Sequence, residues 1–536
     1  MQGLVDFLDS LLRGAMLVGF SLALGGVAWR LLILAGRPRV PDIAVRRGLV
    51  LVAIGATGLA GTQIAALALK ASVLSGFLGR DALGDFAATA YFIAGATRAG
   101  LALGLAGWAL WFEQTSSRVG GWVVPVVLAL SIAVSGAWLT HAAGRLEQRA
   151  ALMTLTVAHQ VAAAVWVGGL FQLGALWRLA RRHPEVDALW PVLVARFSRL
   201  ALASVLALVL AAVPVGLVYV GSGEGLIGTG FGSLIVIKVM LLGAALFLAA
   251  FNLAAARAPG RAGAPALRAR LPYLVEAETL FAVMILFTAA SLSMQPPAAD
   301  LTAERATWSE VVEVFRPKWP ELRTPSVVTM RADRAERERT PDAYRWSNFS
   351  HNVAGLILLG MGGLALVGPV AGRRWGLFWP LGFVLLAAFV GLRGAANEGT
   401  WPFGTTSLAE LGAEGIQHRI AALLVLSLGL LEWRARAGRQ SRGALSWLFP
   451  VLAAVGGILL LTHSHTAFQL KAGFLVQVTH ATMGALAAVV AAGRWLELRL
   501  DPPAARVAGG VAALAMLIIA LVLVFYREAN VVITSG

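Results

Sequence analysis

The sequence contains about 14 runs of roughly 20 largely apolar residues, the length that a helix needs to cross a bilayer. Because 58% of the chain is hydrophobic and 13% is charged, too little polar surface exists for a water-soluble fold. The sequence therefore predicts an all-α polytopic membrane protein in contact with a lipid bilayer. We expect spans near residues 11–35, 48–70, 87–112, 122–142, 151–178, 198–220, 231–256, 272–294, 351–369, 377–394, 416–433, 445–463, 473–495 and 507–527.

The segments between these spans differ strongly in charge. If successive spans alternate in direction, one set of segments contains 23 arginines, and the short segments of the other set contain only Arg80, Arg145, Arg149 and Lys471. Short cytoplasmic loops are rich in basic residues, so the first set is predicted to be cytoplasmic and both termini to lie outside. The first set comprises segments 36–47, 113–121, 178–199, 257–270, 370–376, 434–444 and 494–506.

Residues 295–350 form the one long polar segment, with nine basic and nine acidic side chains. We expect a small external cap here, between an eight-helix half (1–294) and a six-helix half (351–536). Residues 11–35 are too long for the apolar part of a secretory signal, so we expect them to be a retained first span.

Two features of the composition limit the function. The formal charge of +16 arises mostly from the cytoplasmic loops, so it reports orientation in the membrane and does not indicate nucleic-acid binding. The chain contains no cysteine, which excludes disulfides, thiolate zinc sites and iron–sulfur clusters. A bound metal would need histidine, methionine, carboxylate or backbone ligands.

The histidines are placed unevenly in this topology. Only His183 is predicted to be cytoplasmic, and the other seven fall in the outer half of the membrane or at its outer surface. Ionisable residues are costly inside a bilayer and commonly serve a function there. The seven are His141, His159, His351, His418, His463, His465 and His480.

Five of these histidines come from the C-terminal half, at one predicted depth. Met483 follows His480 by three residues and Gln477 precedes it by three, so the three share one helix face. Imidazole and thioether together suit Cu(I). A lone histidine near a span end more commonly makes interfacial or hydrogen-bonding contacts, so the prediction rests on the group. We predict a main metal site at His351, His418, His463, His465, His480 and Met483, with Glu414 and Gln477 as accessory residues.

The N-terminal half offers a lesser set of candidates on the same side. We predict a second site at His141, His159 and Met153. Lys238 is expected inside the bundle as a counter-charge or proton relay. Arg98 is expected to be held there by a salt bridge or a backbone carbonyl.

A family resemblance lies in the first half, over roughly residues 150–295. Its motifs are the run from His159 through Trp166 to Gly169, then Arg196-Phe197-Ser198, then Gly230-Phe231-Gly232 leading to Lys238, and Asn252. These residues resemble the CopD/PcoD copper-resistance membrane proteins. The C-terminal half, with Glu398, Gln417-His418 and His480, looks like the extension of longer members, which adds Glu398 to the accessory residues.

The resemblance implies a bacterial inner-membrane protein that binds copper ions, Cu(I) or Cu(II), and often has a periplasmic CopC-like partner. With no ATP-binding motif in the sequence, we expect copper to be taken at the periplasmic face and moved inward without ATP and without enzymatic catalysis. Two alternatives remain open: a b-type haem electron-transfer protein with histidine ligands, and a copper chaperone or assembly subunit that does not transport.

Overall fold

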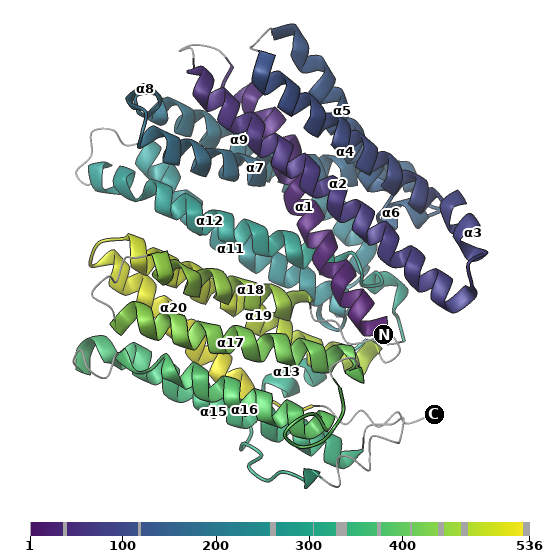
Figure 1. Cartoon of the computed structure of the whole chain (residues 1–536), viewed down its shortest axis with the longest axis vertical. Coiled ribbons are helices and arrows are strands. Elements are labelled where there is room, and N and C mark those ends of the chain that lie inside the picture. The colour runs from purple at the N-terminus through teal and green to yellow at the C-terminus, as the bar shows by residue number, and fades with distance from the viewer. Residues whose placement is uncertain are drawn as a thin grey trace. The chain divides into compact units, whose positions relative to one another are not determined.

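The computed structural model is helical, with no strand among the residues that it describes (Figure 1). This confirms the predicted all-α class. The described residues are 2–35, 40–115, 119–257, 264–303, 305–327, 340–371, 377–407, 410–437, 444–462 and 470–528.

Nineteen α-helices in these ranges carry the labels used below. They are α1 (Gln2–Leu32), α2 (Asp42–Leu78), α3 (Ala82–Ala88), α4 (Ala90–Thr115), α5 (Val123–Ala137), α6 (His141–Gly144), α7 (Arg149–Ala180), α8 (Pro184–Asp187), α9 (Trp190–Val220), α10 (Gly223–Ile227), α11 (Gly230–Arg257), α12 (Ala264–Leu292), α13 (Trp308–Phe315), α15 (Pro341–Ala371), α16 (Leu381–Glu398), α17 (Ala413–Ala437), α18 (Leu448–Thr462), α19 (Leu470–Arg499) and α20 (Ala504–Val524).

Every predicted span overlaps one of these helices. In the described part of the chain, 11 helices are long and apolar enough to cross a membrane. The apolar helices α5 and α18 have 15 residues each, but each follows a four-residue 3₁₀ turn. At about 1.5 Å per α-helical and 2.0 Å per 3₁₀ residue, turn and helix together reach about 30 Å, the thickness of the hydrocarbon core. Helix α17 covers the remaining predicted span. The exact number of spans and the side of the termini stay predictions.

The chain forms two compact units. The N-terminal unit comprises residues 8–222 and 238–300. The C-terminal unit comprises residues 1–7, 223–237 and 301–536, and it holds the segment after Leu301 that was predicted as an external cap.

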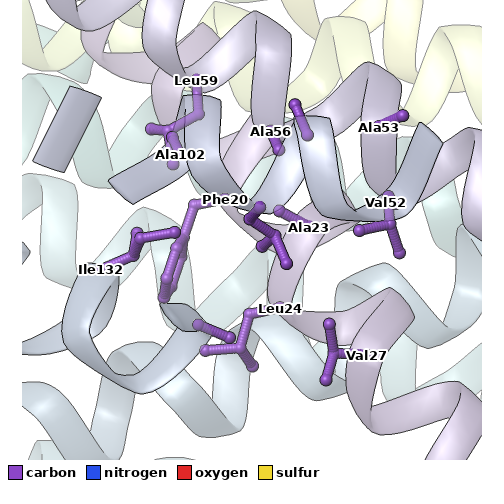
Figure 2. Packing of buried hydrophobic residues seen from close by; sticks show 14 of the residues in the cluster. Phe20, Ala23, Leu24, Val27, Val52, Ala53, Ala56, Leu59, Ala102 and Ile132 are labelled. Carbon is purple, nitrogen blue, oxygen red and sulfur yellow. The ribbon is translucent and has the colours of Figure 1, made fainter. Parts of the chain in front are cut away.

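The core of the N-terminal unit is built from apolar residues of α1, α2, α4 and α5. Figure 2 shows Phe20 of α1 among Leu59, Ala102 and Ile132, all at most 2% exposed. Many of the remaining core positions are alanine, which lets neighbouring helices approach closely.

Glycines allow α1 and α7 to approach even more closely. A Cβ on Gly168 of α7 would overlap the carbonyl oxygen of Ser21, and a Cβ on Gly25 would overlap that of Ala164. In contrast, a Cβ on Gly174, two turns further along α7, would meet no atom within 4 Å. Only the first two positions therefore require glycine for packing.

Replacing Gly168 with alanine is expected to destabilise the protein by about 2–3 kcal/mol, because two backbones must separate to admit the methyl group. The matched change Gly174→Ala is expected to be neutral or to stabilise by up to about 1 kcal/mol through helix propensity. Thermal unfolding in detergent compares the two variants. Equal effects on the melting temperature would show that α1 and α7 do not cross at Gly168.

Six helices of the C-terminal unit form a closed ring. Helix α15 packs against α16 and α20, α17 packs against α16 and α18, and α19 packs against α18 and α20. The ring order is thus α15, α16, α17, α18, α19 and α20. This order lets α15 and α19, which are distant in sequence, both border α20.

A short amphipathic helix of the predicted cap, α13, is attached to this ring. Its buried Val311 and Val314 pack against Phe474, Leu475 and Val478 of α19. Thr307 and Glu310 form a capping box at its N-terminus, and Lys471 of α19 lies 2.7 Å from the Glu310 carboxylate. The cap is therefore fixed to α19 by both apolar and ionic contacts.

The attachment is expected to weaken in acid. Slight burial alone would raise the pKa of Glu310, but the Lys471 ammonium and the Thr307 hydrogen bonds outweigh burial and lower it. A carboxylate with a lowered pKa stabilises the folded state above its unfolded pKa, and that contribution disappears as the pH falls through its folded pKa. We expect Glu310→Gln to lower the melting temperature at pH 7 and to match wild type once the pH has fallen below the lowered pKa of Glu310.

The control for this prediction is Glu313→Gln. Glu313 is exposed, and its partners among the described residues, Arg316 and Lys318, lie next to its own helix, so its loss is expected to change stability little at any pH. A Glu310→Gln deficit that persists unchanged in acid would contradict the ionic attachment.

Candidate metal centre

Two predicted ligands meet in the six-helix ring. His351 lies on α15 and His480 on α19, and their ring centroids are 5.8 Å apart with an interplanar angle of 87°. Because metal–nitrogen bonds are about 2 Å long, two imidazoles on one ion have centroids within roughly 6 Å of each other. The two rings are near enough to bind one ion together.

Backbone hydrogen bonds define which nitrogen of each ring carries the lone pair. The His351 Nδ1 lies 2.9 Å from the Ser347 carbonyl oxygen, and the His480 Nδ1 lies 2.9 Å from that of Val476. A carbonyl oxygen only accepts, so both Nδ1 atoms carry the proton and both lone pairs are on Nε2. This backbone anchoring of the second ring nitrogen is typical of histidines that bind metal.

Tyr526 completes the group, and it was not predicted. Its ring stacks on His351 at 4.1 Å and lies edge-on to His480 at 6.2 Å. The side chain is 2% exposed. Tyr526 therefore restricts the orientation of both imidazoles from the end of α20.

Asn352 holds Tyr526 in place through the backbone. Its side-chain amide donates to the carbonyl oxygens of Leu523 and Tyr526, at 3.0 and 3.1 Å. Its oxygen accepts from the Glu321 amide at 2.6 Å and from Arg527 at 2.7 Å. These four bonds use the full capacity of the amide, which is 0% exposed. Asn352 thus ties α15 and the chain after α20 to residue 321, within the predicted cap.

The remaining predicted ligands of this half are placed differently. Met483 and Gln477 lie one turn on either side of His480 and are buried, 3% and 6% exposed. His418 is exposed at the start of α17. His463, His465 and the side chain of Glu414 lie outside the described residues.

Glu398, an accessory residue in the prediction, is held in an ion pair. Arg419 donates to its carboxylate at 2.9 Å and also bonds to the Thr400 hydroxyl. The carboxylate is 7% exposed and faces Gly415, where a Cβ would approach Oε1 to 2.6 Å. Its visible role is to connect the end of α16 to α17.

Among the described residues, no group of three or more histidine, aspartate and glutamate side chains is close enough to hold a metal ion. The structure brings together only two of the predicted ligands within its described part, His351 and His480, next to Tyr526. The larger five-histidine site stays a prediction.

The N-terminal candidates contact different turns of α9. His159 donates its Nδ1 proton to the Leu208 carbonyl oxygen at 3.1 Å, whereas the His141 ring lies edge-on to Tyr219 at 6.3 Å. Residues 208 and 219 are three turns apart, roughly 16 Å along the helix. Met153 is half-buried on α7.

Lys238 is half-buried on α11 and acts electrostatically on His159. It makes no ion pair with a described residue. The expected role as a counter-charge or relay stays a prediction.

Two residues of the centre escaped the sequence reasoning. Asn352 directly follows His351, and a polar asparagine inside a predicted membrane span indicates a hydrogen-bonding contact between helices. Tyr526 is one of only five tyrosines, and it lies at the outer end of the last predicted span. Neither position could be connected to His480 without the ring order.

By its helices this chain is a multi-pass helical membrane protein, and comparison with known proteins relates one segment to copper resistance. Residues 191–292, which span α9 to α12, match the family model described as copper resistance protein D. The resemblance seen in the sequence is confirmed over that segment, and His159 lies outside it.

A relative is the copper transport protein CutJ of Bacillus subtilis (strain 168). It is 25% identical over 197 residues, which cover 37% of this chain and 35% of that protein. The chain therefore matches about a third of the length of this curated relative. No solved structure matches the chain.

Proposed function

We propose that this chain is a copper-binding protein of the bacterial inner membrane that takes copper at the periplasmic face and moves it inward without ATP. The observation that carries the proposal is the pair His351 and His480, 5.8 Å apart with both Nε2 lone pairs defined by backbone hydrogen bonds. The match of residues 191–292 to a copper-resistance family supports the choice of metal.

The donor set favours copper over the harder cations. Magnesium and calcium prefer oxygen ligands, whereas imidazole and thioether suit copper, and Cu(I) above all. The chain has no cysteine, so thiolate does not compete for the metal. Met483, one turn beyond His480 on α19, is the next soft donor toward the arginine-rich end of that helix.

The proposed orientation rests on the charge of the loops. If the arginine-rich segments are cytoplasmic, the first residues of α15 and α19 lie on the periplasmic side, with both termini, so the histidine pair is nearer to periplasmic copper. In this orientation the cap, anchored through Asn352 and α13, is exposed to a periplasmic copper chaperone of the CopC type, which we propose as the partner.

Copper uptake into sealed proteoliposomes tests this function. External Cu(I), supplied with an internal fluorescent chelator, is expected to enter vesicles that contain the wild-type protein faster than empty vesicles. Vesicles that bind copper without any internal signal would favour the chaperone or storage role. Uptake that is unchanged in a His351→Ala, His480→Ala double variant would contradict a role of this histidine pair in copper transport.

The haem alternative stays open, because the same two imidazoles could ligate the iron of a b-type haem. A strong Soret band in purified protein without copper would overturn the copper proposal. We assign no catalytic residue.

A further inference from the structure

Helix α13 of the cap has an apolar face of which only half is used for packing. Val311 and Val314 are buried against α19. Trp308, Val312 and Phe315 are exposed, Trp308 by 66% and Val312 by 46%. Their spacing of i, i+4 and i+7 puts these three on one side of the helix, next to the buried pair. A continuous exposed apolar face of this kind marks an interaction surface.

Contacts place α13 at the level where two candidate membrane spans begin. It packs against Phe474 and Val478, which lie about 5 and 10 Å along the span that starts at Lys471. Just before α13, the Ala306 amide donates at 2.9 Å to the Gly228 carbonyl oxygen, which directly precedes the span in α11. Helices that lie in a membrane interface are buried to a similar depth, about 5–10 Å into the boundary between headgroups and acyl chains.

Helix α13 also lies outside the six-helix ring. Val478 precedes His480 by two residues, so the two side chains point to nearly opposite sides of α19. His480 faces inward, since its ring meets those of His351 and Tyr526. Val478, which contacts α13, therefore faces away from the ring. This is the side on which a membrane-spanning helix can contact lipid.

Two more exposed tryptophans lie at the end of the ring where α15 and α19 begin. Trp319 is 93% exposed, and its carbonyl oxygen accepts a bond from Arg527, just beyond α20. Trp401 is 84% exposed and follows the end of α16, where Arg393 donates to Ser350 in the first third of α15. Helices α16 and α19 are opposite each other in the ring order, so the exposed tryptophans are distributed around the ring. Such a belt is typical of a membrane interface, whereas a protein partner would meet one side.

We propose that α13 is an interfacial helix whose exposed apolar face lies on the lipid bilayer, between headgroups and acyl chains. Its polar side, with Glu313, then faces water, and Glu310 keeps its ion pair with Lys471. This placement also fixes the depth of the histidine pair, because Val478 lies about 3 Å from His480 along α19. The pair is then near the membrane boundary, where an ion arrives from water without crossing the apolar core.

Nitroxide labels on single introduced cysteines test the proposal, since the chain has no cysteine of its own. The full-length protein in phosphatidylcholine liposomes is labelled either in Val312→Cys, on the apolar face, or in Glu313→Cys, on the polar side. We expect the Val312 label to collide with oxygen, to be shielded from a water-soluble nickel chelate and to lie about 5–10 Å below the headgroup level. The Glu313 label is the matched control and is expected to show the reverse accessibility.

Equal exposure of both labels to the nickel chelate would overturn the proposal, because the apolar face would then lie in water. Shielding of the Val312 label from both oxygen and the chelate would also overturn it, since protein would then cover the face, either the N-terminal unit or a second copy of the chain. Phe315→Cys, on the same face, gives the same readout if Val312→Cys does not fold. None of these outcomes depends on copper, so the proposed function is tested separately.

Discussion

Replacing His351 and His480 together with alanine is expected to weaken Cu(I) binding by at least about 100-fold, because loss of an outer-shell partner alone costs about 10–100-fold in metal affinity. The two rings approach to 5.8 Å, and each is oriented by a carbonyl one turn earlier. Competition with a chelator of known Cu(I) affinity, followed by metal analysis, measures the change.

His183→Ala is the control for this prediction. His183 precedes α8, pairs with Glu185 at 3.2 Å and is predicted to lie on the cytoplasmic side. Its replacement is expected to leave Cu(I) affinity unchanged. An unaltered affinity in the double variant would contradict the assignment of the centre, and an equal loss in His183→Ala would show that binding is not specific to it.

The second large effect is expected at Asn352. Replacing it with alanine removes four hydrogen bonds and leaves the Glu321 amide without its acceptor, whereas the Leu523 and Tyr526 carbonyl oxygens keep their bonds from the Tyr526 amide and Arg527. Since each lost hydrogen bond costs about 0.5–1.5 kcal/mol and an unsatisfied amide about 1–3 kcal/mol, we expect a destabilisation of about 3–5 kcal/mol. The end of α20 is also released, so Tyr526 loses its position over His351.

Asn348→Ala offers a matched comparison one turn earlier on α15. Asn348 accepts one hydrogen bond, from the Glu528 amide at 2.8 Å, and is 9% exposed. Its loss is expected to cost about 1 kcal/mol. Thermal unfolding ranks the variants, and a Cu(I) titration shows whether Asn352→Ala also weakens binding. Similar stability of the two variants would show that Asn352 does not connect α15, α20 and the cap.

The helical fold was predictable because apolar runs of span length have few alternatives. Hydrophobic length alone located the long helices, since a membrane requires every backbone group to be paired within its own segment, but it did not predict short helices such as α13. Sequence spacing also placed His480, Gln477 and Met483 on one helix, because a periodicity of 3.6 defines a face.

The pairing of helices was not predictable in the same way. That α15 and α19 both border α20 is a property of the ring, and without it His351 and His480 could not be singled out from the five predicted histidines. The depth of His418 resembled that of the other histidines, yet its side chain is exposed, because depth along a helix does not determine which way a residue faces. Arg98 shows the same limit: its guanidinium carbon lies 5.5 Å from the centroid of the Phe20 ring of α1, far away in sequence, and it forms no salt bridge or carbonyl contact with any described residue.

The most direct test of the proposed copper centre is X-ray absorption at the copper edge on protein loaded with one equivalent of Cu(I). We expect nitrogen scatterers at about 2 Å with the outer-shell signal of two imidazoles. In either His351→Ala or His480→Ala, we expect the signal of a single imidazole. A spectrum without imidazole scattering, or one that is the same in wild type and both variants, would contradict a copper ion shared by His351 and His480.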